Sequence, residues 1–131
     1  MRAFGLAICA TIAVVAQAAA GAEDVRFEKS LKMIDPAERL EQLCDYTAMA
    51  QIRKNNPPHR PDRAVANAMG EPKVTGDTLK ASGGAFRSRK KWYALAFSCT
   101  ATPDHMSIVS FQYTIGPEIP ETQWAGYGLY Q

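Results

Sequence analysis

Two short polar segments carry residue types that bind metal ions or transfer protons. Asp104 and His105 lie in "ATPDHMS", and His59 and Asp62 lie in "NNPPHRPD". Imidazole and carboxylate groups are ligands of zinc and are general acids and bases. The segment "NNPPHRPD" is a proline-rich loop. If this loop lies beside "ATPDHMS", these four residues form a metal site or the centre of a small hydrolase.

A tight turn explains the residue types of "ATPDHMS" without any catalytic role. Pro103 fixes its own backbone angle, and the side chain of Asp104 accepts hydrogen bonds from a turn backbone. Strand-like segments flank the pair, so we expect Asp104 and His105 at the tip of a β-hairpin. The spacing of the two histidines and two aspartates matches no metal-binding motif. We therefore predict no catalytic residues, no metal and no cofactor.

The remaining inventory of catalytic motifs is thin. The chain contains no G-x-S-x-G nucleophile elbow, no H-E-x-x-H zinc motif and no phosphate-binding glycine loop. Catalytic groups also assemble from distant residues, so the hydrolase remains an alternative hypothesis. The sequence favours a protein that is not an enzyme.

The N-terminus has the build of a secretory signal peptide, which we place at residues 1–22. Arg2 precedes an apolar run that ends at Val15, and small residues follow up to Ala22. This run is shorter than the roughly 20 apolar residues of a transmembrane helix, and no longer apolar run follows. We expect a periplasmic or secreted protein without a membrane span after cleavage.

The cysteines fit this export. Cys9 lies in the predicted signal peptide, which leaves Cys44 and Cys99 in the exported chain. Two cysteines in an oxidising compartment predict a disulfide, and they lack the C-x-x-C spacing of a redox pair. The two cysteines are 55 positions apart. Closing a loop of this length stabilises a fold by about 4 kcal/mol in the chain-entropy model.

Basic residues are distributed unevenly. Residues 51–91 contain ten Lys and Arg residues and three acidic residues, a local net charge of +7, whereas residues 92–131 contain no Lys or Arg. Such a region attracts an acidic polysaccharide, a lipid phosphate or an acidic protein surface. Basic residues also protect sheet edges from aggregation, which is the alternative explanation. Export and a total charge of only +2 argue against nucleic acid. The densest cluster is Arg87, Arg89, Lys90 and Lys91.

The first half of the exported chain reads as helical. Residues 23–34 form a flexible lead-in, and Asp35, Pro36 and Glu38 are typical of a helix start. We predict a long helix over residues 36–53, ended by the proline-rich loop. A short second helix is predicted over residues 62–69, with Gly70 just past its end.

The second half alternates with a period of two, which indicates strands. "VTGDTLKA" predicts a strand or a strand pair, "AFRSR" a short strand, and "WYALAFSCT" and "SIVSFQYTI" the two strongest strands. Side chains two positions apart share one face of a strand. The predicted core faces of the last two strands are Tyr93, Leu95, Phe97 and Cys99, and Val109, Phe111, Tyr113 and Ile115.

The predicted disulfide constrains the architecture. Cys44 lies on the apolar stripe of the long helix and Cys99 on the core face of a strand, so they meet only if the helix lies across the sheet. We therefore expect one α+β domain over residues 35–131, with one long helix plus a short helix packed on a three- to four-stranded antiparallel meander.

The sequence resembles the bacterial domain-of-unknown-function family 930. The matching segments, within residues 35–130, include "DPAERLEQLCDYTAM", "PDRAVANA" and "IPETQWAGYGLY". The resemblance implies an exported or envelope-associated domain and carries no established activity. We therefore expect a small periplasmic non-enzymatic binding or accessory module of the cell envelope, whose partner is an unknown envelope protein or anionic envelope component. The alternative is a small periplasmic hydrolase or metal-dependent enzyme using His59 or His105 with Asp62 or Asp104.

Overall fold

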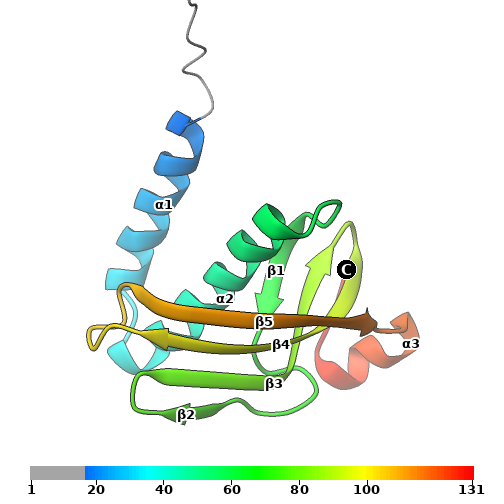
Figure 1. The fold of residues 1–131 in the computed structure, drawn as a ribbon. Coiled ribbons are helices and arrows are strands. Elements are labelled where there is room, and N and C mark those ends of the chain that lie inside the picture. The colour runs from blue at the N-terminus through cyan, green and yellow to red at the C-terminus, as the bar shows by residue number, and fades with distance from the viewer. Residues whose placement is uncertain (1–16) are drawn as a thin grey trace, which may run out of the picture.

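The computed structural model describes residues 17–131, with side chains from residue 24 onward. The predicted signal peptide lies mostly outside these residues, as does Cys9. No helix of the described part is long and apolar enough to cross a membrane. Along the chain (Figure 1), the elements are α1 (Gln17–Lys32), α2 (Pro36–Asn55), β1 (Pro61–Val65), β2 (Lys73–Thr75), β3 (Thr78–Ser88), β4 (Lys91–Ala101), β5 (Ile108–Glu118), α3 (Glu121–Trp124) and the 3-10 turn η1 (Ala125–Tyr127).

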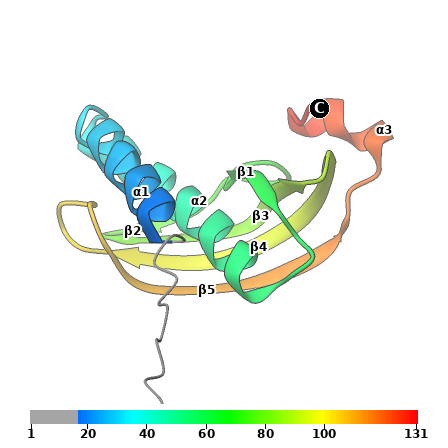
Figure 2. The ribbon, with the colours of Figure 1, turned by 90° about the horizontal axis from the view of Figure 1, so that it is seen from above.

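The strands form one five-stranded antiparallel sheet, and the two longer helices, α1 and α2, cover one of its faces (Figure 2). The strand order is β1-β3-β4-β5, and β2 pairs with another stretch of β3. Figure 2 shows α1 and α2 on the same side of the curved sheet. The prediction of an α+β fold with a long helix on an antiparallel meander is confirmed, because β3, β4 and β5 follow one another as neighbours.

The long helix begins where its capping residues predicted. The Asp35 side chain accepts a hydrogen bond from the Ala37 N–H at 2.9 Å, and Pro36 occupies the first helical position. The helix ends at Asn55, two residues beyond the prediction, because Pro57 and Pro58 cannot continue its hydrogen bonding.

The predicted short helix over residues 62–69 is wrong. Its first half is strand β1, in which Ala64 lies opposite Phe86 and Val65 opposite Ala85 of β3. The N–H groups of Ala68 and Met69 then donate to the Gly83 carbonyl. A helix of eight residues is only marginally stable, even with a cap at each end. Pairing with β3 instead gives hydrogen-bond partners to the backbone N–H and C=O groups of both strands.

Two other segments are more regular than expected. Residues 23–32, read as a flexible lead-in, lie in helix α1, where Leu31 is buried and the Phe27 ring stacks on Tyr46 at 3.8 Å. The short strand predicted at residues 85–89 is, as far as Ser88, the end of the eleven-residue β3, which passes through an irregularity between Ala81 and Gly84.

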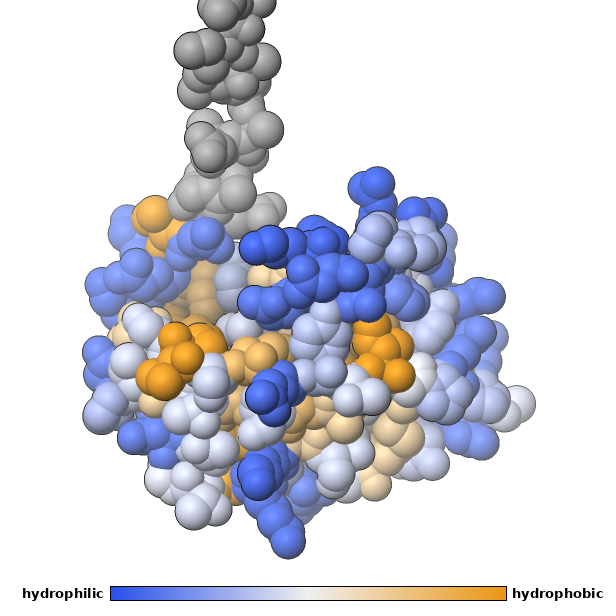
Figure 3. Space-filling model, in the orientation of Figure 1, coloured by the Kyte–Doolittle hydropathy of each residue, from blue (hydrophilic) through white to orange (hydrophobic). Residues whose placement is uncertain are grey.

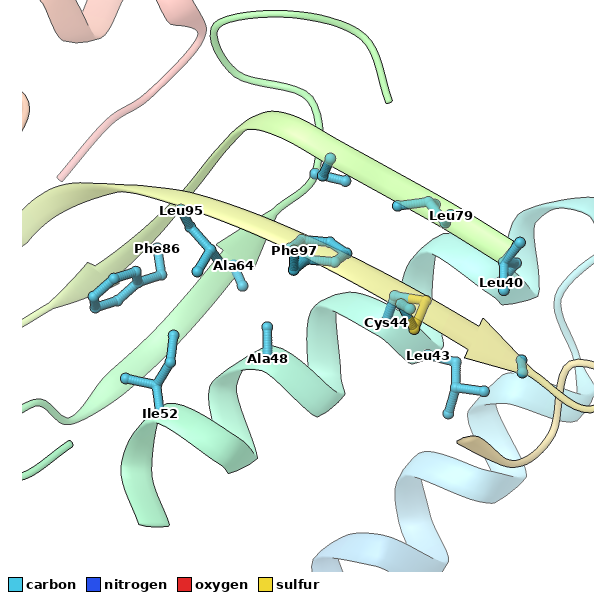
Figure 4. Close-up of a cluster of buried hydrophobic side chains, with 14 of the residues drawn as sticks. Leu40, Leu43, Cys44, Ala48, Ile52, Ala64, Leu79, Phe86, Leu95 and Phe97 are labelled. Atoms are coloured by element: carbon cyan, nitrogen blue, oxygen red, sulfur yellow. A yellow bond between two sulfur atoms is a disulfide. The ribbon is translucent and has the colours of Figure 1, made fainter. Parts of the chain in front are cut away.

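The main core lies between α2 and the sheet (Figure 4). Residues of α2 at three- and four-residue steps pack against alternate residues of β3 and β4. The predicted core face of β4 is confirmed, because its residues all lie in this core. On β5, Val109 is 65% exposed and Ile108 packs on the core instead, because the register shifts between Thr100 and Ala101. The central members of this core are Leu40, Cys44, Ala48, Ile52, Leu79, Leu95, Phe97 and Cys99.

The predicted disulfide joins the two layers of this core. Cys44 of α2 and Cys99 of β4 are bonded, with their Cα atoms 6.0 Å apart, and both are fully buried. The bond therefore fixes the long helix to a central strand.

A second, smaller core lies on the opposite side of the β3–β4 hairpin. Trp92 packs there with Ile119, Trp124 and Leu129 from the C-terminal segment. The indole N–H of Trp92 donates to the Tyr130 carbonyl at 2.8 Å. The tryptophans thus fasten the chain end to the sheet.

Candidate anion-binding site

The long helix separates the two histidine segments. The His105 Nδ1 lies 3.0 Å from the carbonyl of Pro36 at the start of α2, whereas the His59 N–H donates to the Asn56 carbonyl just past its end. A helix of 20 residues is about 30 Å long. Metal–ligand bonds are near 2 Å, so His59 and His105 cannot share one metal ion. In the described residues, no three His, Cys, Asp or Glu side chains cluster to hold one.

Asp104 and His105 occupy the β4–β5 turn, as predicted. The Asp104 carboxylate accepts hydrogen bonds from the Thr102 hydroxyl at 2.6 Å and the Met106 N–H at 3.1 Å, and these bonds lower its pKa. His105 contacts the Pro36 carbonyl and, at 2.9 Å, the carboxylate of Asp77. These two acceptors, the carbonyl first, raise the pKa of His105. The pair therefore serves to hold the turn.

Two of the four clustered basic residues, Arg87 and Lys91, have carboxylate partners within the described part of the chain. The Arg87 guanidinium binds both carboxylate oxygens of Asp62, at 2.9 and 3.1 Å, and lowers the pKa of that carboxyl group. It also lies 5.8 Å from the centre of the Trp92 ring. Lys91 lies 3.7 Å from Glu118. These contacts give Arg87 and Lys91 structural roles.

The other two, Arg89 and Lys90, form the exposed tip of the β3–β4 hairpin. Both have positive φ angles, 52° and 66°, as in the tight two-residue turns that connect antiparallel strands. The Arg89 Nε donates to the Pro58 carbonyl at 3.3 Å. This bond fixes the hairpin tip beside the proline-rich loop.

Two further arginines reach the same place from the other side. Arg53 lies in the last turn of α2 and donates to the Pro61 carbonyl at 2.6 Å, and Arg60 is exposed in the loop. With Arg89 they border a hollow of about 730 Å³, which we call the basic hollow. Its complete lining is Arg53, Pro57, Pro58, His59, Arg60, Pro61, Asp62 and Arg89.

The electrostatics of the basic hollow favour an anion. Asp62 is its one acidic lining residue, and Arg87 already pairs with it. None of the ion pairs in the described part of the chain involves Arg53, Arg60 or Arg89. Guanidinium groups bind carboxylate and phosphate oxygens with two parallel hydrogen bonds. Backbone carbonyls anchor two of the three guanidiniums, which leaves their other N–H groups for a ligand.

The sequence located only part of this site. Of its three arginines, Arg89 belonged to the predicted cluster, and Arg53 and Arg60 were counted only within the wider basic region. Nothing in the spacing of Arg53 and Arg89, 36 positions apart, indicates that they meet. Their meeting depends on where the end of α2 crosses the sheet.

A second unusual group is the buried carboxyl of Asp45 on α2. Burial, followed by the charge of Glu41, raises its pKa to about 8. Its Oδ1 has no hydrogen-bond partner among the described residues. At neutral pH the carboxyl group is therefore mainly protonated, and it contributes no charge to binding.

Comparison with known proteins places the chain in a family. The profile of the Domain of Unknown Function (DUF930) matches residues 31–129. The chain belongs to this family. The DUF930 match begins at Leu31, which is buried in the main core, and ends at Leu129 of the second core, so it includes the basic hollow. No curated protein and no solved structure matches the chain.

Proposed function

We propose that this protein is a small, exported, non-enzymatic module that binds an anionic component of the cell envelope at the basic hollow. The observation that carries the proposal is the convergence of Arg53, Arg60 and Arg89 without a carboxylate partner in the described residues. Three cations close together repel one another, and a bound anion removes that repulsion.

Two features support an exported site of action. The N-terminal sequence has the order of charged, apolar and small residues of a secretory signal. The buried Cys44–Cys99 disulfide is typical of proteins that fold in an oxidising compartment such as the periplasm.

The surroundings of the basic hollow support binding rather than catalysis. Its lining also includes three prolines and His59, whose ring meets the rings of Phe86 and Tyr93 edge-on at 5.1 and 4.7 Å. A packed histidine of this kind orients the loop. The arginines supply charge and N–H donors, which recognise an oxyanion but do not by themselves transfer protons.

Binding by mature protein, residues 23–131, tests the proposal. Probes are vesicles containing phosphatidylglycerol and a soluble acidic polysaccharide, each at several salt concentrations. The double variant Arg60→Ser/Arg89→Ser removes two charges from the basic hollow. Its matched control, Lys73→Ser/Lys80→Ser, removes two charges near the β2–β3 turn, at the other end of β3.

We expect the Arg60/Arg89 variant to lose at least about tenfold in affinity, equivalent to about 1.4 kcal/mol, and the lysine control to bind nearly as well as wild type. Equal losses in both variants would indicate general charge attraction without a site. Absence of wild-type binding to either probe would reject an anionic ligand of these two classes.

A further inference from the structure

The two edges of the sheet differ in how they are protected. On one side, β1 has five residues and a register shift after Pro61, and β2 has three residues beginning with Lys73. Short strands, bulges, prolines and lysines are the devices by which proteins prevent edge-to-edge pairing. This edge therefore carries several of them.

The other edge, β5, is less protected, because its two register shifts against β4, Pro117 and Glu118 all lie outside residues 110–115. It has eleven residues and, among the described residues, pairs with β4 alone; Figures 1 and 2 show it as the last strand of the sheet. Residues 110–115, which pair with β4 without a register shift, include no charged residue and no proline. Along this stretch, every second residue directs its N–H and C=O groups away from β4. A regular and neutral edge of this kind is a ready template for another strand.

We propose that β5 pairs antiparallel with β5 of a second copy of this chain, so that two sheets join into one across a two-fold axis. A two-fold axis places the residues at the axis opposite or next to their own copies, so a charge near the centre of the pairing would lie close to the same charge of the second copy. The neutral stretch avoids this cost. A different strand partner would be selected by complementary charges, and this stretch offers none.

The side chains suit such pairing on both faces. With the axis at Gln112, Phe111 lies opposite Tyr113 of the second copy, and Ser110 lies opposite Thr114 of the second copy. Phe111 and Tyr113 are half-buried against the main core and would gain cover, while the hydroxyl and amide groups pair on the other face. Figure 3 shows that other face, where pale residues of weak hydropathy lie over the sheet together with a few hydrophilic side chains and two strongly hydrophobic patches.

The mass of the mature protein in solution tests the proposal, measured by size-exclusion chromatography with light scattering across a range of concentrations. We expect a dimer for the wild type. Gln112→Lys places two lysines opposite each other and should weaken the dimer about tenfold or more. Ser82→Lys is the control, because Ser82 is exposed on the inner strand β3. Circular dichroism checks that both variants fold.

A cysteine pair tests the position of the axis. Gln112→Cys should cross-link two copies with a short bismaleimide, whereas Ser98→Cys, on the neighbouring strand and directly opposite Gln112, should not. A monomeric wild type at all concentrations overturns the proposal. A dimer that Gln112→Lys leaves unchanged also overturns it, as does a monomer that captures an extended peptide on β5.

Discussion

His105 Nε2 lies 2.9 Å from the carboxylate of Asp77, so the β4–β5 turn is tied to the start of β3. The other ring nitrogen faces the Pro36 carbonyl at 3.0 Å. Both neighbours are hydrogen-bond acceptors, and only the protonated imidazole has two N–H donors. The residue that resembled part of a reactive pair therefore joins two turns to the beginning of α2.

Stability should depend on pH through this contact. The folded pKa of His105 lies above its unfolded value of 6.5, so the stabilisation is complete below about pH 6.5 and is lost as the pH rises through the folded value. His105→Gln should lower the melting temperature more at about pH 5.5 than at about pH 9. Thermal unfolding of both proteins across this range gives the comparison. An equal decrease at every pH would mean that the ring contributes packing only.

Asp45 should produce a second pH effect of the same sign. Burial raises its folded pKa to about 8 from 3.8, so the native state binds the proton more tightly and stability decreases as the pH rises from about 4 to about 8. Asp45→Asn keeps the shape without the charge. It should abolish most of this decrease and make the protein more stable than wild type at about pH 9, by an amount on the order of a few kcal/mol. Urea unfolding at both ends of the range measures the difference, and a destabilised Asn variant at high pH would contradict the assignment.

The disulfide should contribute a large part of the free energy of unfolding. Replacing Cys44 and Cys99 together by Ala should cost about 4 kcal/mol, with a further penalty because both side chains are fully buried. Denaturant unfolding of the oxidised wild type and the double variant measures the loss. Peptide mapping without reductant provides the control, since free thiols at both positions of the wild type would invalidate the comparison.

Arg87 should affect stability rather than anion binding. Its bidentate contact with Asp62 ties β3 to β1, and its side chain is only 15% exposed. A lysine cannot form the two parallel hydrogen bonds that the Arg87 guanidinium makes with Asp62. Arg87→Lys should therefore destabilise the fold by about 1 kcal/mol, a small value because solvent screens the exposed carboxylate of Asp62.

Anion binding by the folded Arg87→Lys variant provides the complementary measurement. Affinity should stay within about twofold of wild type, in contrast to Arg60→Ser/Arg89→Ser. A loss of affinity as large as that of the double variant would place Arg87 among the binding residues.

The sequence alone determined the parts of the fold that depend on local patterns. The capping residues Asp35 and Pro36 defined the start of the long helix, and alternation defined β4, because both signals act within a few residues. Export chemistry and two remaining cysteines were enough to predict the Cys44–Cys99 bond. That bond in turn implied a helix lying across the sheet. The hairpin at Asp104 and His105 followed from turn chemistry.

Only the tertiary structure decided the features that depend on distant partners. Residues 62–65 form a strand because they pair with the edge of β3. A one-residue shift in the register between β4 and β5 leaves Val109 exposed and places Ile108 against the core. Arg53, Arg60 and Arg89 line one hollow because the end of α2 lies beside the β3–β4 hairpin. Arg87 pairs with Asp62 and is therefore not among the arginines that line it. Pairing, register and charge convergence are set by which segments pack together, and no local pattern in the chain encodes that choice.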